Sequence, residues 1–342
     1  MRVLVVKMSS LGDVIHTLPA VTDAAAALPD LEIDWVVEEA FAEVPRWHPA
    51  VRRVIPVALR RWRRQGPRAL LGGEWGAFRR DLRSEQYDLV IDAQGLLKSA
   101  VVARMARGPV AGLDRDSTRE RAACFFYQQR LAVPKGQHAI TRVRKLFAAA
   151  LDYRLPARPP DYGLPRQQFA SEPGPGPAGH VLFLHGTTWP TKHWPEAYWT
   201  ELARQVTGAG LQVQLPQGSA EERERAERIA ATVAGATVLP DLSLTQIAAH
   251  IAGARAVVAV DTGLAHLAAA LDVPGITLYG ATEPGLTGTE GRNQRHLQAE
   301  IGCKVSSVQE SVAAQANRAR LPLRSSGPAA RRKSMSGPGW PR

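Results

Sequence analysis

Three short segments of the chain combine side chains that can bind a phosphate group with a carboxylate or a histidine nearby. The first, KMSSLGDVIH at residues 7–16, follows an apolar run. Ser9 and Ser10 offer hydroxyl and backbone N–H groups at the start of a helix, where Gly12 allows a close approach. Asp13 is expected in the first helical turn, facing a cleft. Helix capping is the alternative, because Ser and Asp also satisfy the free N–H groups at such a start. The segment lacks the GxGxxG spacing of dinucleotide oxidoreductases.

The second segment is HGTTWPTKHWP at residues 185–195, directly after the apolar run VLFL. Thr187, Thr188 and Lys192 place hydroxyl donors and a cation in one loop, and such a loop can hold a diphosphate by charge and hydrogen bonds. Pro195 suits the first position of the next helix. The alternative for Lys192 is an ordinary surface cation, and the two tryptophans of this loop are expected to pack.

The third segment, VDTGLAHLAAA at residues 260–270, joins an apolar run to an alanine-rich helix. Asp261, Thr262 and Gly263 stand at the helix start, where exposed N–H groups and a small residue make an anion site. His266 follows Thr262 by four residues and therefore shares its helical face. A histidine in an apolar helix can equally be a core residue, so both interpretations of His266 stay open.

All three segments follow short apolar runs, which predicts that they lie at the ends of strands. VLVV, IDWVV and DLVIDA alternate with helix-length stretches before residue 155, and HVLFLH, LQVQLP, ATVLP, AVVAVD and PGITLYG do so after residue 180. This alternation is typical of parallel sheets covered by helices on both faces. Residues 156–179 are dense in Pro and Gly, which predicts an interdomain linker. We therefore expect two α/β domains, 1–155 and 180–302, with the three segments facing one cleft.

Composition excludes several other classes of protein. The chain has 342 residues and a net charge of +11, of which residues 301–342 contribute +7. The remaining +4 is ordinary for a soluble enzyme and argues against nucleic-acid binding. No apolar run reaches the roughly 18 residues of a membrane-spanning helix. The N-terminal run is broken by Lys7 and precedes no cleavage site, so we expect a cytoplasmic protein. Cys124 and Cys303 form neither a disulfide framework nor a metal-binding spacing.

Basic residues are concentrated at LRRWRR, residues 59–64, and continue with Arg68, Arg79, Arg80 and Arg83. Such a cluster can meet nucleic acid, acidic sugars or an anionic membrane surface. A solvated helix face is the alternative.

Taken together, the segments resemble those of the lipopolysaccharide heptosyltransferase I family, within glycosyltransferase family 9. The resemblance is carried by KMSSLGDVIHTLPA, HGTT…KHWP, and VDTGLAHLAAAL followed by YGATEPGLTG, and it covers residues 1 to about 300. IDAQGLLKSA at 91–100, the basic cluster and QHAITRVRKLF at 137–147 are similar to the family as well. The TT…KHWP and DTGLAHL forms match type I rather than type II.

The resemblance implies a GT-B fold, in which two Rossmann-like domains face each other across a cleft. It implies transfer of L-glycero-D-manno-heptose from ADP-heptose to 3-deoxy-D-manno-octulosonic acid (Kdo) on lipid A, with inversion at the anomeric carbon. Asp13 matches the family's base, and burial against the two substrates is expected to help it take a proton. Lys192 would stabilise the departing diphosphate. No catalytic metal or other cofactor is implied.

The same match assigns residues to the two substrates. The residues implied to bind the donor are Thr187, Thr188, Lys192, Glu222, Leu242, Asp261, Thr262, Gly263 and His266. The residues implied to bind the acceptor are Ser9, Ser10, Arg60, Arg61, Arg63, Arg64, Lys98 and Arg142. Arg144 is a further candidate for the acceptor's anionic groups, and Trp62 is expected at the membrane interface. The implied partners are ADP-heptose, Kdo-lipid A and the anionic inner membrane, contacted peripherally from its cytoplasmic face, with no nucleic acid.

The end of the chain departs from the family pattern, which fades near LQAEIGCKV. Residues 303–342 are rich in Gly, Pro, Ser and Arg, which predicts a basic, disordered tail. A changed reading frame near residue 302 would produce this shift and would leave the two domains less well latched. Two alternatives therefore stay open: another nucleotide-sugar transferase such as type II, and a catalytically impaired nucleotide-sugar binder.

Overall fold

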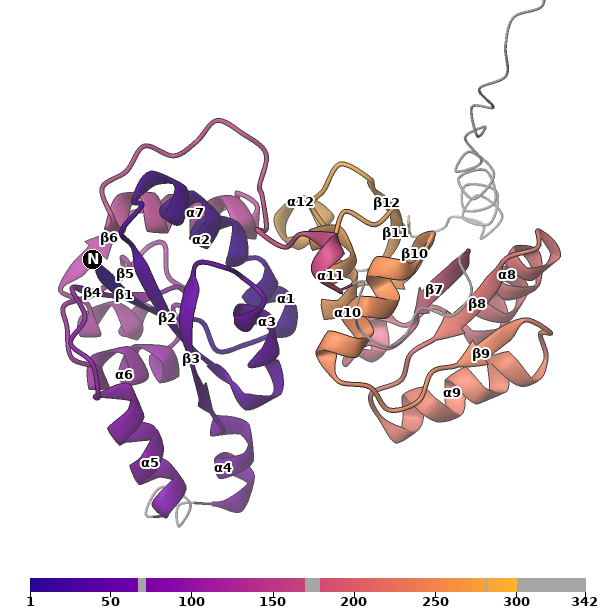
Figure 1. Ribbon diagram of the computed structural model, residues 1–342, viewed down its shortest axis with the longest axis horizontal. Coiled ribbons are helices and arrows are strands. Elements are labelled where there is room, and N and C mark those ends of the chain that lie inside the picture. The colour runs from indigo at the N-terminus through magenta and orange to yellow at the C-terminus, as the bar shows by residue number, and fades with distance from the viewer. Residues whose placement is uncertain (67–71, 170–178, 281, 300–342) are drawn as a thin grey trace, which may run out of the picture.

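The protein contains two α/β domains, each built on a six-stranded sheet whose strands are all parallel. The computed structural model describes residues 1–66, 72–169, 179–280 and 282–299. The first sheet consists, in spatial order, of β3 (Val51–Val57), β2 (Glu32–Glu38), β1 (Arg2–Val6), β4 (Leu89–Asp92), β5 (Val110–Leu113) and β6 (Gln129–Leu131). The second consists of β12 (Gln294–Gln298), β11 (Gly275–Tyr279), β10 (Ala256–Val260), β7 (His180–Leu184), β8 (Gln212–Leu215) and β9 (Ala236–Val238). The predicted α/β fold class is confirmed, and Figure 1 shows the domains side by side.

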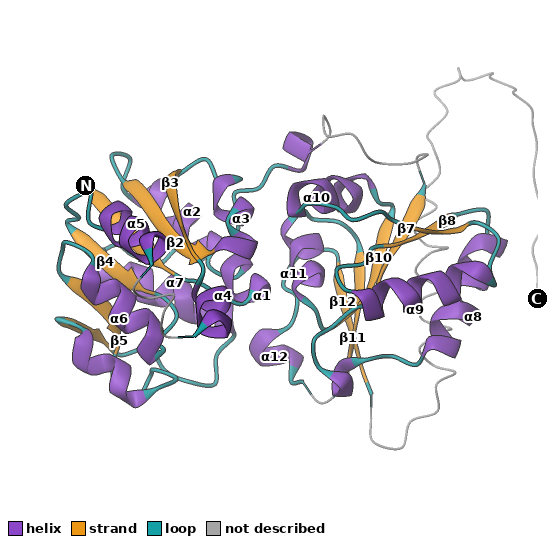
Figure 2. Ribbon diagram, turned by 90° about the horizontal axis from the view of Figure 1, so that it is seen from below, coloured by secondary structure: helices purple, strands orange, loops and turns teal. Residues whose placement is uncertain are grey.

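Helices cover both faces of each sheet, as parallel strands buried on both sides require (Figure 2). The N-terminal domain has α1 (Leu11–Ile15), α2 (Leu18–Ala27), η1 (Glu39–Phe41), α3 (Glu43–Arg46), α4 (Leu59–Gln65), α5 (Gly73–Leu82), α6 (Leu97–Met105), η3 (Arg121–Phe126) and α7 (Ala139–Ala150). The rest of the described chain has η4 (Arg166–Phe169), η5 (Pro190–Lys192), α8 (Glu196–Gly208), α9 (Ala220–Ala231), α10 (Leu244–Gly253), α11 (Gly263–Ala270) and α12 (Pro284–Thr287). None of the helices in the described ranges is long and apolar enough to cross a membrane. The predicted tail, 303–342, lies outside these ranges.

The apolar runs predicted eight of the strands, and four others carry a weaker pattern. β3 reads VRRVIPV, and it forms an edge of the first sheet. Its arginines and Pro56 interrupt the apolar run, which an edge strand tolerates because one side of its backbone needs no partner. β12 reads QRHLQ and forms an edge of the second sheet. The central strands β1, β4, β7 and β10 are almost wholly buried, which explains why their sequences are predominantly apolar.

The domains touch most closely where α1 meets α11. A Cβ atom added to Gly12 would lie 2.7 Å from the imidazole of His266, and one added to Gly263 would lie 2.8 Å from Leu11. Each helix therefore needs a glycine at the crossing, since any larger residue would push the domains apart. These glycines were expected to allow the close approach of a ligand. They also allow the close approach of a side chain from the other domain.

Further contacts hold the two domains in place around this crossing. The Glu43 carboxylate, at the start of α3, accepts the backbone N–H of Thr245 at 2.8 Å, close to the N-terminus of α10. The Trp47 indole donates to the Thr245 hydroxyl at 3.1 Å. Tyr162, in the predicted linker, is buried and donates its hydroxyl to the Glu290 carbonyl at 2.8 Å. One cluster of buried apolar side chains accordingly contains residues of both sheets.

Arg144, a candidate for the acceptor, lies instead in a buried ion pair. Its guanidinium on α7 contacts the carboxylate of Asp23 on α2 at 2.6 Å, and both side chains are almost inaccessible to solvent. Arg158, which is 46% exposed, contacts the other Asp23 oxygen at 3.4 Å. The expectation for Arg144 was wrong, because its guanidinium is paired with a buried carboxylate and joins α7 to α2.

This pair gives a test of the fold. Asp23→Ala leaves the Arg144 guanidinium buried without a carboxylate, which should lower the free energy of unfolding by about 3–5 kcal/mol. Arg158→Ala removes an exposed partner of the same carboxylate and should cost less than about 1 kcal/mol. Urea unfolding followed by circular dichroism measures both. Equal, small losses of unfolding free energy in the two variants would show that the buried Arg144 guanidinium does not need the Asp23 carboxylate.

Candidate active site

The crevice between the domains holds three adjoining cavities. The first, about 380 Å³, lies on the N-terminal side, the second, about 420 Å³, lies between loops of both domains, and the third, about 770 Å³, lies in the C-terminal domain. Lys192 and Asp261 line both the first and the second cavity. Thr187 and Thr262 line both the second and the third. A ligand with several linked parts can therefore extend through all three.

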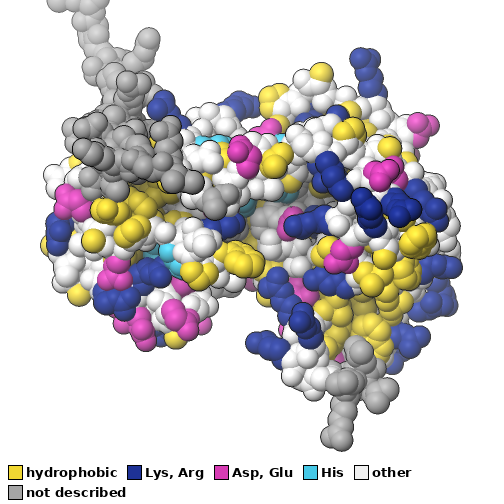
Figure 3. All heavy atoms as spheres, turned by 180° about the vertical axis from the view of Figure 1, so that it is seen from behind, with side chains coloured by type: hydrophobic (Ala, Val, Ile, Leu, Met, Phe, Trp, Pro, Cys, Tyr) yellow, Lys and Arg dark blue, Asp and Glu magenta, His cyan; other side chains and the backbone are white. Residues whose placement is uncertain are grey.

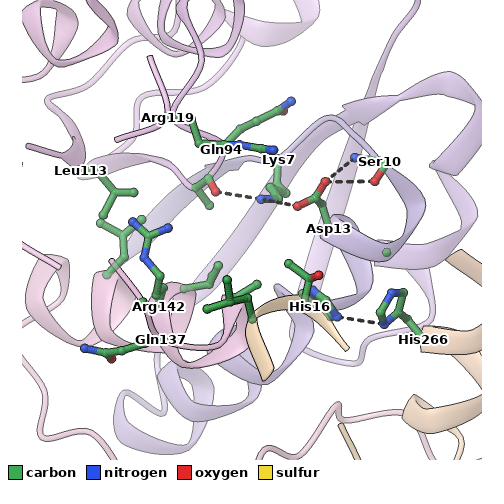
Figure 4. A pocket seen from close by; sticks show the side chains of 18 of the residues that line it. Lys7, Ser10, Asp13, His16, Gln94, Leu113, Arg119, Gln137, Arg142 and His266 are labelled. Carbon is green, nitrogen blue, oxygen red and sulfur yellow. Dashed lines mark hydrogen bonds and ion pairs between the residues drawn. The ribbon is translucent and has the colours of Figure 1, made fainter. Parts of the chain in front are cut away.

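Asp13 faces the first cavity from the first turn of α1. One carboxylate oxygen accepts the backbone N–H and the hydroxyl of Ser10, both at 3.0 Å, and the other lies 3.5 Å from the Lys7 ammonium. Lys7 also donates to the Ala93 carbonyl at 3.1 Å (Figure 4). The carboxylate thus caps its own helix and still presents a partly exposed face to the cavity. Asp13 therefore caps its helix and also faces the crevice.

The charge state of Asp13 is set by burial and by its charged and polar neighbours. Burial raises the pKa of this carboxyl, but Lys7 and the two Ser10 hydrogen bonds act the other way and hold its pKa well below the usual range. Asp13 is therefore a carboxylate at neutral pH and is ready to accept a proton. Its neighbours therefore reduce its basicity, and the prediction that burial against the two substrates helps Asp13 take a proton stays a prediction.

Lys192 reaches the second cavity from η5 and meets the third segment there. Its ammonium lies 2.6 Å from the Asp261 carboxylate, and the Thr187 hydroxyl donates to the Asp261 carbonyl at 3.2 Å. Thr262 is the N-cap of α11 and makes no side-chain hydrogen bond to the helix start. The first N–H groups of α11, Lys192 and the two threonines therefore surround one space that suits an anion.

Two histidines from different domains meet between the first and second cavities. Nε2 of His16, at the end of α1, lies 3.0 Å from Nδ1 of His266 on α11. Burial and the neighbouring imidazoles of His266 and His138 lower the pKa of His16, and burial lowers the pKa of His266 to about 4. Both rings are therefore neutral at pH 7, and one donates a hydrogen bond to the other. His266 is both a buried contact between domains and part of the cavity wall.

Two arginines supply positive charge on the far side of the first cavity. Arg142 donates to the Ser117 carbonyl at 2.6 Å, while its Nε has no partner in the described part of the chain. Burial and the charge of Arg119 lower the pKa of Arg142, but a guanidinium remains charged. Arg119 lines the same cavity from the loop after β5 (Figure 4). Neither arginine has a carboxylate partner among the described residues, so both are available to an anionic ligand.

Glu222 and Leu242 line the third cavity. A carboxylate oxygen of Glu222 accepts the N–H of Gly218 at 2.9 Å, and the same side chain lies directly against Gly186. The cavity is lined by polar and apolar side chains of the C-terminal domain together with Leu11 and Phe41 from the other domain. Its size and mixed lining suit a nucleoside.

Most of the residues predicted for the site line one of these cavities. They are Ser10, Asp13, Arg60, Arg142, Thr187, Thr188, Lys192, Glu222, Leu242, Asp261, Thr262, Gly263 and His266. Five others do not line them: Ser9, Arg61, Arg63, Arg64 and Lys98. Ser9 is buried beneath the loop and accepts a hydrogen bond from Gln94 at 3.4 Å.

The arginines of the basic cluster on α4 lie in different environments. Arg60 lies over the ring of Phe41, 5.2 Å from its centroid, and lines the second cavity. Arg61 is engaged by Glu39 and Glu74, whereas Arg63 and Arg64 are exposed. Trp62, expected at a membrane interface, is instead buried, and its indole donates to Glu74 at 2.9 Å. That expectation was wrong because α5 packs over the indole ring.

Sequence reasoning missed several residues of the site. Lys7, His16, Gln94, Arg119 and His138 line the first cavity or hold a residue that does. Lys7 and His16 stand within the first segment, so their spacing from Asp13 was a usable signal. His138 stands in the family-like segment 137–147, as the N-cap of α7, so that segment was a usable signal, whereas Arg119 lies in a loop without a recognisable motif. In the described part of the chain no three His, Cys, Asp or Glu side chains are grouped to hold a metal ion.

Comparison with known proteins places these features in one family. The model of "Glycosyltransferase family 9 (heptosyltransferase)" matches residues 75–316. Lipopolysaccharide heptosyltransferase 1 of Pseudomonas aeruginosa is 61% identical over 305 residues, 89% of this chain and 85% of that protein. The Escherichia coli K12 protein of the same name is 50% identical over 300 residues, 87% of this chain and 94% of its own length. The solved structure of E. coli heptosyltransferase WaaC with ADP-2-deoxy-2-fluoro heptose has a TM-score of 0.84 and 46% identity, covering 92% of this chain and all of that one.

The buried histidine pair predicts a loss of stability in mild acid. The pKa of His266 falls from its ordinary 6.5 to about 4 on folding, so the unfolded chain takes up the proton first. The stabilisation is complete above pH 6.5 and is lost as the pH falls towards 4. Unfolding free energy measured by urea at several pH values should show this. In His266→Gln the loss over that window should be smaller by roughly 2–3 kcal/mol.

His48 and His185 also have pKa values lowered to about 4 by burial, so only the difference between parent and variant isolates His266. Identical pH dependence in the two proteins would contradict the proposed neutral state of the pair.

Proposed function

Because the chain belongs to glycosyltransferase family 9, the heptosyltransferases, we propose that it transfers L-glycero-D-manno-heptose from ADP-heptose to Kdo of lipid A. This is a step of lipopolysaccharide inner-core synthesis. The single observation that carries the proposal is the position of Asp13, which faces an anion-binding space formed by Lys192 and the N-terminus of α11. A base and a leaving-group site on opposite sides of one crevice are what an inverting transfer requires.

The donor is assigned to the second and third cavities. The third cavity would hold adenosine, with Glu222 near the ribose and Leu242 near the base. The diphosphate would lie in the second cavity against Thr187, Thr188 and Lys192, with the free N–H groups of α11 beside it. Support comes from the E. coli relative, whose solved structure holds an ADP-heptose analogue.

In the proposed reaction, the acceptor hydroxyl and the leaving diphosphate lie on opposite faces of the heptose ring. The acceptor hydroxyl oxygen attacks the anomeric carbon of the heptose while the bond from that carbon to the diphosphate oxygen breaks. Asp13 takes the hydroxyl proton, and ADP leaves with the bonding electron pair towards Lys192. When the donor phosphates bind, Lys192 can exchange its contact with Asp261, 2.6 Å away, for a contact with the departing oxygen.

The acceptor is assigned to the first cavity and its mouth. Arg142, Arg119 and Arg60 line the crevice with positive charge, and Arg63 and Arg64 lie exposed beyond it. Kdo carboxylates and lipid A phosphates carry the complementary charge, and the arginine fork contacts two oxygens at once. Because this acceptor is a lipid, the proposal includes peripheral contact with the anionic cytoplasmic face of the inner membrane.

Replacing the base tests the assignment of Asp13. Asp13→Asn keeps the shape of the side chain but removes the proton acceptor, so turnover of ADP-heptose with Kdo-lipid A should fall by about 10²- to 10⁴-fold. The donor affinity should stay within about threefold of the parent, because Asp13 does not line the third cavity. ADP release and isothermal titration with ADP-heptose provide the two measurements.

Asp116→Asn, at an exposed loop position, is the matched control and should behave like the parent. Turnover of Asp13→Asn at the parental rate would remove Asp13 from the mechanism. A parent chain that binds ADP-heptose but never turns over would support the alternative of a catalytically impaired binder. A parent that prefers an acceptor already carrying one heptose would support a type II enzyme.

We also propose that the reaction needs no metal ion, because Lys192 and α11 can supply the positive field at the diphosphate. Turnover in buffer treated with excess EDTA should then remain within about twofold of untreated enzyme. Lys192→Gln should lower turnover by about 10²-fold or more in either buffer. Abolition of parental activity by EDTA, with recovery on adding Mg²⁺, would refute this part of the proposal.

A further inference from the structure

Apolar side chains are concentrated on one outer face of the N-terminal domain. Six large hydrophobic side chains in the described part of the chain are exposed, and three of them lie on α6 and η3. They are Leu97, Val101 and Phe125, with 43%, 40% and 70% of their surfaces exposed. Leu97 and Val101 are four residues apart on α6 and therefore share one helical face. Figure 3 shows an apolar patch on this domain, bordered by Lys and Arg side chains.

The two elements that carry these side chains run side by side. At one end, the backbone N–H of Leu97 donates to the Glu120 carboxylate, at the start of η3, at 2.6 Å. At the other end, Gln128 and Val110, which follow η3 and α6, exchange two hydrogen bonds of 2.9 Å. The three exposed side chains therefore stand on two adjoining elements, and we call them together the α6 patch (Leu97, Val101 and Phe125).

Exposed cations lie around the α6 patch. Lys98, Arg104, Arg107 and Arg121 are on or next to α6 and η3, and among the described residues none of them has a carboxylate partner. The carboxylate of Glu120, which precedes Arg121 in the sequence, accepts the N–H of Leu97.

Arg107 also belongs to a second group of cations, which extends the basic border. A hollow of about 420 Å³ is lined by Gly76, Arg79, Arg80, Arg83 and Arg107. Arg79 and Arg80 lie in the last turn of α5, and Arg83 is its C-cap, one turn beyond Arg79. Arg83 donates to the carbonyl of Met105, which places the hollow beside the end of α6.

The carboxylates of α5 do not neutralise this group. Glu74 is engaged by Arg61 and Trp62, and Asp81 is engaged by Arg53. The positive charge of the hollow is therefore left for an external partner, and four guanidinium groups around one space suit phosphate oxygens.

We propose that the α6 patch and its arginine border dock this protein on an anionic bilayer. An apolar centre enters the interface between headgroups and acyl chains, while arginines at its edge hold lipid phosphates. The inference rests on the proposed function in one respect, namely that the acceptor is anchored in a membrane. The position fits that use, because α6 begins three residues after Gln94, which lines the first cavity. Docking through α6 therefore brings the acceptor side of the crevice to the bilayer.

Co-sedimentation of the full chain with vesicles tests the docking face directly. We expect binding to phosphatidylcholine vesicles containing about 30 mol % phosphatidylglycerol, and much weaker binding to pure phosphatidylcholine vesicles. Arg104→Gln with Arg107→Gln should lower affinity for the anionic vesicles by about 25-fold, at roughly fivefold per charge. Val101→Glu with Phe125→Ser should lower it by about tenfold or more.

The matched control removes two exposed arginines from α8 and α9, at the far end of the other domain: Arg204→Gln with Arg223→Gln. Its affinity should stay within about threefold of the parent, because only long-range charge is lost. Equal losses in the control and the Arg104/Arg107 variant would overturn the proposal, as would equal binding of the parent to neutral and anionic vesicles.

An activity arm separates this inference from the proposed transfer reaction. Turnover is measured with a lipid-free Kdo acceptor in solution and with Kdo-lipid A embedded in the anionic vesicles. Both patch variants should keep parental turnover on the soluble acceptor and lose about tenfold or more on the embedded one. If the parent transfers heptose in both formats while the patch variants match it in both, the docking face is wrong and the enzyme assignment stands. If the parent turns over neither acceptor but still binds anionic vesicles through this face, the enzyme assignment fails and the docking face stands.

Discussion

The close crossing of α1 and α11 is the contact on which the rest of the site depends. Gly12 and Gly263 let the two helices approach closely. The side chain of His266 packs against Gly12, and the side chain of Leu11 packs against Gly263. Each of these helices begins where a central strand of its own sheet ends. The crossing therefore brings the carboxyl ends of two separate parallel sheets together, and the loops there face each other.

Charge in the crevice is balanced in pairs across a short distance. Asp13 is paired with Lys7, and Asp261 is paired with Lys192, so neither carboxylate repels an incoming diphosphate as a free anion would. The same pairing explains why the carboxyl of Asp13 has a lowered pKa despite its burial. A carboxyl group with such a lowered pKa stays ionised at neutral pH. Arg119 and Arg142, which have no carboxylate partner within the described ranges, lie on the side of the crevice that we assign to the acceptor.

Arginine serves three separate purposes in the N-terminal domain, although its sequence presents a single basic composition. Arg144 joins two helices through a buried carboxylate, Arg61 holds α4 against its neighbours through Glu39 and Glu74, and Arg119 and Arg142 face the first cavity. The arginines on α5 and after α6 are exposed, and no described carboxylate pairs with them. The positive charge of the domain is therefore divided between buried packing contacts, the wall of the first cavity and the outer surface.

The sequence alone determined the two parallel sheets and the three loops of the site, because central strands buried on both faces must be apolar and the loops follow them directly. It did not determine the edge strand β3, whose arginines and proline are tolerated only because one side of its backbone is free. Nor did it distinguish Arg142, which faces a cavity, from Arg144, two residues along the same helix, which is buried against Asp23. The pairing of His16 with His266 and of Asp13 with Lys7 was likewise decided by tertiary structure. Such contacts depend on distances between elements far apart in the chain, and residue types and local spacing do not encode those distances.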